Sequence, residues 1–320
     1  MKKAAAVLLA IIMLAALCAC GGNITTETPT SQSGNATQNA GDNSTPAPGT
    51  DTDPTAEPGD QTTAEPQPVA GTEGLGYKDD GEGILITSLG DATAKEIVIP
   101  SHIDGKPVTA IDEEAFRGTD ITSLTVPWTV KKIDEDAFAN CTQLASVEFA
   151  EGLTGIYDSA FYGCTALKKL TLPSTLLSIG YYGFSDCTAL EEVTVLGGNT
   201  IVGTRAFSGD AALKTVEFKG TAMYGYSVQG NAFDGCVSLT EVRFSEGLDT
   251  IGSWCFSGLS ALKTVYLPKS VSKIEGCAFL RSGLEKVYYA GSEDDWKAIN
   301  IKSSNDELTG AEIEYNYKGQ

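Results

Sequence analysis

The sequence predicts a β-rich solenoid, wound into successive coils with one parallel strand per coil, short helical or 3-10 turns and a small C-terminal cap. Two repeating features predict it: a phenylalanine that returns at a near-constant interval, and a strand-like run within each interval. A unit of about 23 residues is too small to bury its own apolar face. Neighbouring units must therefore stack on one another, as in repeat proteins.

The recurring phenylalanine is present in eight units. Its spacings are 22, 23, 23, 23, 26, 23 and 23 residues, and a branched apolar residue always stands five positions before it. Such regularity predicts that the rings align in one internal row. The row consists of Phe116, Phe138, Phe161, Phe184, Phe207, Phe233, Phe256 and Phe279.

The strand-like run places apolar residues at every second position, as a half-buried strand requires. Leu170 and Leu172 form one example, with Leu167 three residues earlier. Pro173 directly follows this run, where its missing N–H can end a strand ladder at little cost. Acidic residues often precede the Ala-Phe pair, which suits the first turn of a short helical or 3-10 segment.

The full unit L-x-x-V-x-L-P-x-x-V-x-x-I-x-x-x-A-F-x-x-C is nearly complete over residues 167–187 and resembles the BspA-type leucine-rich repeat of bacterial surface proteins. The resemblance covers about residues 94–289, and residues 288–299 are similar to the usual C-terminal cap of that family. It implies a leucine-rich-repeat fold and adhesion to host or bacterial surface proteins. Ser292 and Asp295 form a capping-box pattern, which predicts a short helix over the last coil.

One coil in the middle departs from the pattern. A position that holds Val or Leu in other units is occupied by Asn199 and Gly225, and three extra residues enter around residues 223–226. This coil should be irregular. A local bulge is the favoured interpretation, and an interaction loop is the alternative.

The N-terminus predicts export and lipid anchoring. Lys2 and Lys3 precede an apolar run over residues 4–17, which is shorter than the roughly 20 residues that a spanning helix needs. The segment that follows resembles the lipobox of bacterial lipoproteins, with Cys20 as the lipidated residue. Residues 1–19 are therefore predicted to be a lipoprotein signal peptide, with an ordinary secretory signal as the alternative.

The next segment, residues 20–76, is predicted to be a disordered acidic tether. Seven of the twelve prolines and eight acidic residues lie between residues 21 and 74, with no aromatic residue, Lys or Arg. A flexible chain of about 55 residues has a root-mean-square reach on the order of 40 Å. The solenoid is then assigned to residues 77–288 and a C-terminal capping segment to residues 289–320.

Charge and motif content exclude several function classes. Residues 77–320 carry 34 acidic against 20 basic residues, a net charge of −14, which argues against nucleic acid and against attraction to anionic lipid. His102 is the single histidine, and no nucleophile, phosphate-loop or zinc-protease motif is present. An enzyme, a cofactor and a bound metal are therefore not expected.

The cysteines follow the repeat. Cys141, Cys164, Cys187 and Cys236 each lie three residues after the recurring phenylalanine, which predicts a ladder of small, buried, reduced thiols. A disulfide between neighbouring coils is the alternative.

The outward positions of the predicted strands give the candidate ligand-binding site. Arg243, Tyr266 and Tyr288 occupy the same position in three consecutive coils, and Tyr and Arg dominate the energetics of protein interfaces. The alternative is that aromatic residues at these positions only stabilise the sheet. Along the rest of this face, Lys and Glu on successive coils should pair and neutralise each other.

The predicted function is that of a monomeric binding module, lipid-anchored at the extracellular face of the bacterial membrane. Its partner would be an extracellular protein or glycan. The alternative is a structural protein that organises the envelope by contacting wall components or other membrane proteins, which the modest reach of the tether favours.

Overall fold

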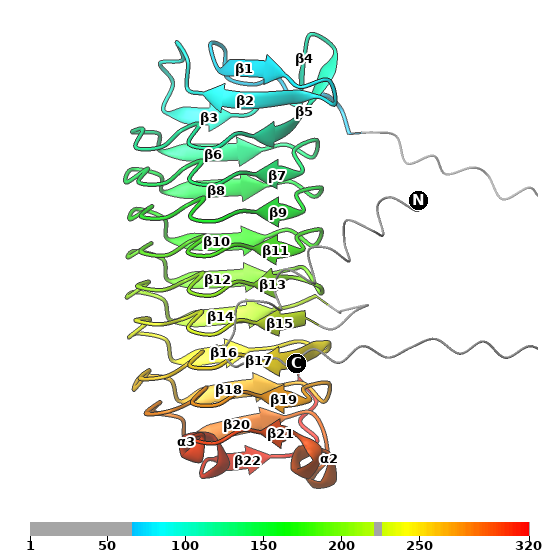
Figure 1. The fold of residues 1–320 in the computed structure, drawn as a ribbon, viewed down its shortest axis with the longest axis vertical. Helices are drawn as coiled ribbons and strands as arrows, with labels where there is room; N and C mark the ends of the chain where they lie inside the picture. Colours follow the sequence, from blue (N-terminus) through cyan, green and yellow to red (C-terminus); the bar gives the residue numbers. More distant parts are fainter. Residues whose placement is uncertain (1–65, 221–225, 320) are drawn as a thin grey trace, which may run out of the picture. The chain divides into compact units, whose positions relative to one another are not determined.

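A computed structural model describes residues 66–220 and 226–319, which form a solenoid of stacked coils (Figure 1). The predicted fold class is confirmed, because parallel strands from successive coils pair along the length of the stack. The predicted signal peptide, Cys20 and most of the predicted tether lie outside the described residues.

Each repeat contributes one strand of three or four residues, here called a major strand, at the position predicted from the alternating pattern. The major strands form a three-stranded and a seven-stranded parallel sheet, with β8 and β10 as neighbours at the junction. Their bounds are β3 (Glu96–Val98), β6 (Ser123–Val126), β8 (Ser146–Phe149), β10 (Lys169–Leu172), β12 (Glu192–Val195), β14 (Thr215–Phe218), β16 (Glu241–Arg243), β18 (Thr264–Leu267), β20 (Lys286–Tyr289) and β22 (Glu312–Glu314).

A second strand per coil, here called a minor strand, was not predicted. These strands form a second sheet that is parallel except for the β1–β2 hairpin and the short β4 (His102–Ile103), which pairs antiparallel with β5. Most are only two residues long. Their bounds are β1 (Gly76–Asp79), β2 (Ile84–Ser88), β5 (Lys106–Ile111), β7 (Lys132–Ile133), β9 (Gly155–Ile156), β11 (Ser178–Ile179), β13 (Ile201–Val202), β15 (Tyr226–Val228), β17 (Leu248–Ile251), β19 (Lys273–Ile274) and β21 (Asn300–Ile301).

The segment around each phenylalanine forms a run of turns rather than a regular helical turn. The residue two before each phenylalanine has φ between 53° and 61°, and the residue two after it has φ between 58° and 82°. Backbone hydrogen bonds to the next coil hold this left-handed conformation, which is otherwise uncommon for residues other than glycine; Phe138 N, for example, donates to Ala160 O at 2.7 Å.

The eight phenylalanines form the predicted internal row. Each side chain is completely buried, and successive ring centroids lie 5.0–5.6 Å apart with interplanar angles of 4–26°. Such contacts stabilise beyond the apolar area that they bury. The row is continuous from Phe116 to Phe279, so each coil seals its core against the next.

The cysteine ladder also lies where the spacing places it. Cys164 and its counterparts are buried free thiols whose Sγ donates to the carbonyl of the phenylalanine one coil earlier, at 3.0–3.4 Å. Burial raises the pKa of the Cys164 thiol. Asp210 takes the same position in the coil of Phe207 and is completely buried.

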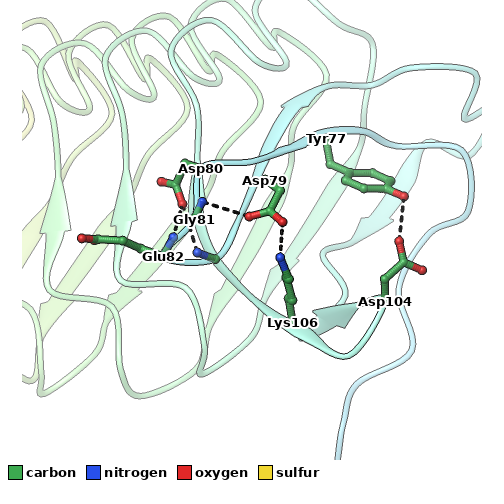
Figure 2. Close-up of polar contacts among 8 residues, drawn as sticks. Tyr77, Asp79, Asp80, Gly81, Glu82, Asp104 and Lys106 are labelled. Atoms are coloured by element: carbon green, nitrogen blue, oxygen red, sulfur yellow. Dashed lines mark hydrogen bonds and ion pairs between the residues drawn. The ribbon is translucent and has the colours of Figure 1, made fainter.

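The N-terminal end of the stack is covered by residues 69–72 and by the β1–β2 hairpin. Thr72 donates its N–H to Val98 O at 2.8 Å and accepts from Val98 N through its hydroxyl, which satisfies the first major strand. Figure 2 shows the hairpin turn, in which Asp80 Oδ1 accepts from Glu82 N at 2.9 Å and Asp79 pairs with Lys106.

The C-terminal end carries two short helices, α2 (Glu293–Ala298) and α3 (Asp306–Thr309). The predicted capping box of Ser292 and Asp295 is confirmed at α2. At the start of α3, two side chains replace the backbone of a further coil: Asn305 Oδ1 accepts from Phe279 N at 3.0 Å, and Glu307 Oε1 accepts from Arg281 N at 2.6 Å. These bonds satisfy donors that would otherwise be exposed at the end of the ladder.

The irregular coil is confirmed at its described edge. The pairing of β15 with β17 shifts register between Tyr226 and Ser227, and β13 pairs with β15 only through Val202 and Val228. Residues 221–225, which include most of the segment where the three extra residues were predicted, lie outside the described residues.

Candidate functional site

The predicted site residues come together on three neighbouring major strands. Arg243 ends β16, and it pairs in register with Tyr266 of β18, which pairs with Tyr288 of β20. The residue preceding each of them points into the core and is fully buried, so alternation along the strand leaves all three partly exposed on the outer surface.

The three side chains stack on one another, and the two tyrosine rings are nearly parallel. The Cζ atom of Arg243 lies 3.6 Å from the centroid of the Tyr266 ring, and the Tyr266 and Tyr288 rings are 4.6 Å apart at an angle of 6°. Both faces of the Tyr266 ring are therefore covered within the protein. What remains available to a partner is the ring edges, the hydroxyl groups and the guanidinium rim.

Tyr317 is a site residue that the sequence did not reveal. Its ring is tilted against both Tyr266 and Tyr288, with centroid distances of 5.4 Å and 4.8 Å. The backbone places it there, because Tyr317 N donates to Tyr289 O at 3.0 Å. Tyr317 lies beyond the last repeat, so no periodic pattern could have found it. Arg243, Tyr266, Tyr288 and Tyr317 are called the C-terminal cluster below.

Carboxylates hold Arg243 of the cluster and the neighbouring Lys286 in place. Arg243 Nε donates to Glu241 Oε1 at 2.6 Å, and although partial burial opposes the charge, this carboxylate raises the pKa of Arg243. Lys286 Nζ lies 4.6 Å from the Tyr288 centroid and pairs with Glu314 at 3.0 Å, which raises the pKa of Lys286. The guanidinium and the ammonium group are thus both charged and both held on ring faces.

A cleft of about 240 Å³ opens beside the cluster. Its apolar part comes from core side chains at the ends of β14, β16 and β18, and two carboxylates, Glu217 and Glu246, stand on its walls. Glu246 is positioned by the N–H groups of Lys269 and Ser270, at 3.0 Å and 3.2 Å. The lining residues are Glu217, Phe218, Arg243, Phe244, Glu246, Tyr266, Leu267, Pro268, Ala290, Tyr317 and Gly319.

This arrangement offers hydrogen-bond donors, acceptors and an apolar floor side by side, which is the chemistry of recognition. His102, the one histidine, is distant in sequence from the C-terminal cluster, and its ring centroid lies 6.1 Å from that of Trp128. Within residues 66–220 and 226–319, no three potential metal ligands gather into one group.

The remainder of this face neutralises its charges as predicted. Lys169 pairs with Glu192 at 2.9 Å, and Lys214 pairs with Glu191 at 2.7 Å, in each case across adjacent coils. Exposed pairs of this kind contribute little stability. They leave the C-terminal cluster as the distinctive feature of the major strands.

Comparison with known proteins agrees with the fold. No curated protein matches the chain. A leucine-rich repeat protein from Bacteroides ovatus is similar, with 23% identity, a TM-score of 0.55 and coverage of 76% of this chain and 66% of that one, so the chain spans slightly less than two thirds of that relative. The leucine-rich repeat protein TpLRR of T. pallidum is 31% identical, with a TM-score of 0.52 and coverage of 59% of this chain and 88% of that one.

Among the described residues, helices are too short and too polar to cross a bilayer. The model of the BspA-type leucine-rich repeat region matches residues 109–224 and 225–299 with six copies, which is more than half of the sequence. The chain therefore belongs to the family of bacterial proteins built from BspA-type leucine-rich repeats.

Proposed function

We propose that the chain is a lipid-anchored surface protein that binds an extracellular protein or glycan through the C-terminal cluster and its cleft. The observation that carries this proposal is the partly exposed stack of Arg243, Tyr266 and Tyr288. It lies beside a cleft with an apolar floor and two carboxylates, Glu217 and Glu246. Leucine-rich-repeat solenoids typically serve as interaction scaffolds, and Arg and Tyr are the residue types that dominate binding hot spots.

A protein partner fits the cluster better than a glycan does. Sugar rings pack on free aromatic faces, but both faces of Tyr266 are covered by Arg243 and Tyr288. A protein can instead use the hydroxyl groups, the guanidinium rim and the two carboxylates of the cleft through hydrogen bonds and ion pairs.

The anchoring part of the proposal depends on the N-terminal sequence. The lipobox-like segment ending at Cys20 supports attachment to the outer face of the membrane by lipid. Replacing Cys20 with Ser should release the chain into the culture medium. Retention of that variant in the membrane fraction would contradict lipid anchoring at this residue.

Binding is tested by recovery of extracellular partners on the immobilised full chain. The variant Arg243→Ala/Tyr266→Ala/Tyr288→Ala should lose at least tenfold in recovery. A matched control replaces Glu148, Thr171 and Thr194 with Ala, because these residues hold the same position on coils nearer the N-terminus. Equal recovery by the cluster variant and the wild type would remove the cluster from the function, provided that both melt at similar temperatures.

A second candidate function is organisation of the cell envelope. It is favoured by the predicted tether, whose reach on the order of 40 Å would keep the solenoid near the membrane. Antibody labelling of intact cells separates the two ideas. Labelling that needs prior digestion of the wall would count against direct contact with host surfaces and would support the envelope function.

A further inference from the structure

A second group of aromatic side chains lies in the turn runs that follow β9 and β11, beside Arg205 in the turn that follows β13. Four of the twelve tyrosines lie within residues 157–182. Tyr157 and Tyr181 are 47% and 48% exposed, which is unusual for side chains of this size. Tyr157, Tyr162, Tyr181, Tyr182 and Arg205 are called the tyrosine patch below.

The patch residues belong to three consecutive coils. Ile156, Ile179 and Val202 pair in register across β9, β11 and β13, so the turns that follow these strands lie one above the other (Figure 1). Neighbouring strands in a sheet are about 4.8 Å apart, so Tyr182 and Arg205, which hold the same position on successive turns, are spaced by roughly this distance, whereas Tyr157 and Tyr181 hold positions that differ by one residue. An extended partner running along the stack would meet one patch group per coil.

The ring faces of the patch differ from those of the C-terminal cluster. Within the described chain, no other aromatic ring or cation stacks on Tyr157 or Tyr181. Gly180 and Gly203 hold the position of Tyr157 in the next two coils and add no side chain there, while the Tyr157 ring lies beside Gly155, where an added Cβ would be 3.1 Å from Cε2. The exposed rings are available to a ligand.

Polar groups surround the rings and hold parts of the patch in place. Arg205 Nη1 donates to the Tyr182 hydroxyl at 2.8 Å, and Asp158 Oδ1 accepts from Tyr181 N at 2.8 Å. Ser159 and Thr204 stand beside the patch residues on these turns, and neither has an aliphatic side chain. An apolar protein interface would need aliphatic surface at its centre, which these positions lack.

We propose that the tyrosine patch binds an extended glycan of the cell wall. A pyranose ring has a C–H face that packs on an aromatic ring and a rim of hydroxyl groups that hydrogen-bond to carboxylate, guanidinium and hydroxyl neighbours. Two half-exposed rings on neighbouring coils, set among such groups, match this chemistry. The patch is separate from the C-terminal cluster, so the inference stands or falls independently of the ligand proposed there.

The test is sedimentation of the full chain with purified, insoluble peptidoglycan. The double variant Tyr157→Ser/Tyr181→Ser should lower the association constant for peptidoglycan at least tenfold. The double variant Tyr157→Phe/Tyr181→Phe keeps both rings, so its association constant should lie within about threefold of the wild-type value. Tyr77→Ser is the matched control, because Tyr77 is 47% exposed on the N-terminal hairpin.

Three results would overturn the proposal: no sedimentation of the wild-type chain, equal binding by the double Ser variant, or an equal loss in the double Phe variant. Thermal melting of each variant checks folding. The triple Ala variant of the C-terminal cluster should sediment like the wild type, which separates this site from the first one. A loss in that variant together with equal binding by the double Ser variant would place glycan binding at the cluster and not at the patch.

Discussion

Replacing Asp210 with Cys should stabilise the protein at neutral pH. The carboxyl group is completely buried in the ladder that holds Cys187 on one side and Cys236 on the other. Its Oδ1 accepts from Cys187 N at 2.8 Å, and its Oδ2 is buried without a hydrogen-bond partner. Burial raises the pKa of Asp210 well above its usual value, although the bond from Cys187 N acts in the opposite direction.

The size of the effect follows from these contacts. A buried polar atom without a partner costs about 1–3 kcal/mol. In the variant, the new thiol at position 210 would donate a hydrogen bond to Phe184 O, just as the Cys187 thiol donates to Phe161 O. Cys187 N would also donate to Phe184 O, just as Cys164 N donates to Phe161 O. No bond is then lost on balance. The expected gain of about 1–3 kcal/mol corresponds to roughly 2–12 °C in melting temperature for a domain of this size.

The pH dependence distinguishes this cause from better packing. Because the pKa of Asp210 is higher in the folded than in the unfolded state, the wild type keeps its full stability below the unfolded-state pKa near 4. Stability is lost as pH rises from there through the folded-state pKa. The advantage of Asp210→Cys should therefore be larger at pH 8 than at pH 4. The variant Asp210→Asn, which keeps the acceptor for Cys187 N but cannot ionise, should show the same trend.

Thermal melts of the wild type and both variants at pH 4 and pH 8 measure these differences. A gain of equal size at both pH values would show that the charge of Asp210 is not responsible. A loss of stability in both variants at pH 8 would refute the reasoning altogether.

Three further predictions concern stability. Phe161→Ala should lower the free energy of unfolding by about 3–5 kcal/mol in urea titrations, because it leaves a cavity in the middle of the ring row, and a loss under 1 kcal/mol would contradict tight packing there. Asn305→Ala should cost about 2–3 kcal/mol and speed amide exchange at Phe279 N; unchanged exchange would mean that Asn305 does not cap the ladder. Burial acts to raise the pKa of Glu151, but hydrogen bonds from Ser174 N, Ser174 Oγ and Thr175 N outweigh it and lower this pKa. The stability that these bonds contribute is present above the unfolded-state pKa and is lost as pH falls through the lower folded-state pKa. Glu151→Gln should therefore weaken the loss of stability between pH 5 and pH 3, and an unaltered pH profile would exclude this role.

The repeat pattern was sufficient to predict the major architecture. Period and composition placed the phenylalanine row, the cysteine ladder and the register of Arg243 with Tyr266, because each depends on the same position recurring in every coil. The minor strands were missed because two residues, such as Ser178–Ile179, are too few to show an alternating pattern. The left-handed turn residues were missed because most, such as Tyr182 and Arg205, are not glycine and carry no local signal.

The candidate site was predicted only in part. Its strand residues follow the repeat, but Tyr317 and the cleft depend on how the chain returns after the last coil. That return is set by long-range hydrogen bonds, such as Tyr317 N to Tyr289 O, that no spacing in the sequence encodes. The lipidation of Cys20 stays a prediction.

The side chains of Asn305 and Glu307 close the ladder at one end, and residues 69–72 close it at the other. These closures satisfy the turn column at one end and the first major strand at the other, while β1, β21 and β22 remain edge strands of the two sheets. A change in length that keeps both closures must insert whole coils between them. Each added unit would lengthen the molecule by about 4.8 Å and would leave both terminal closures intact.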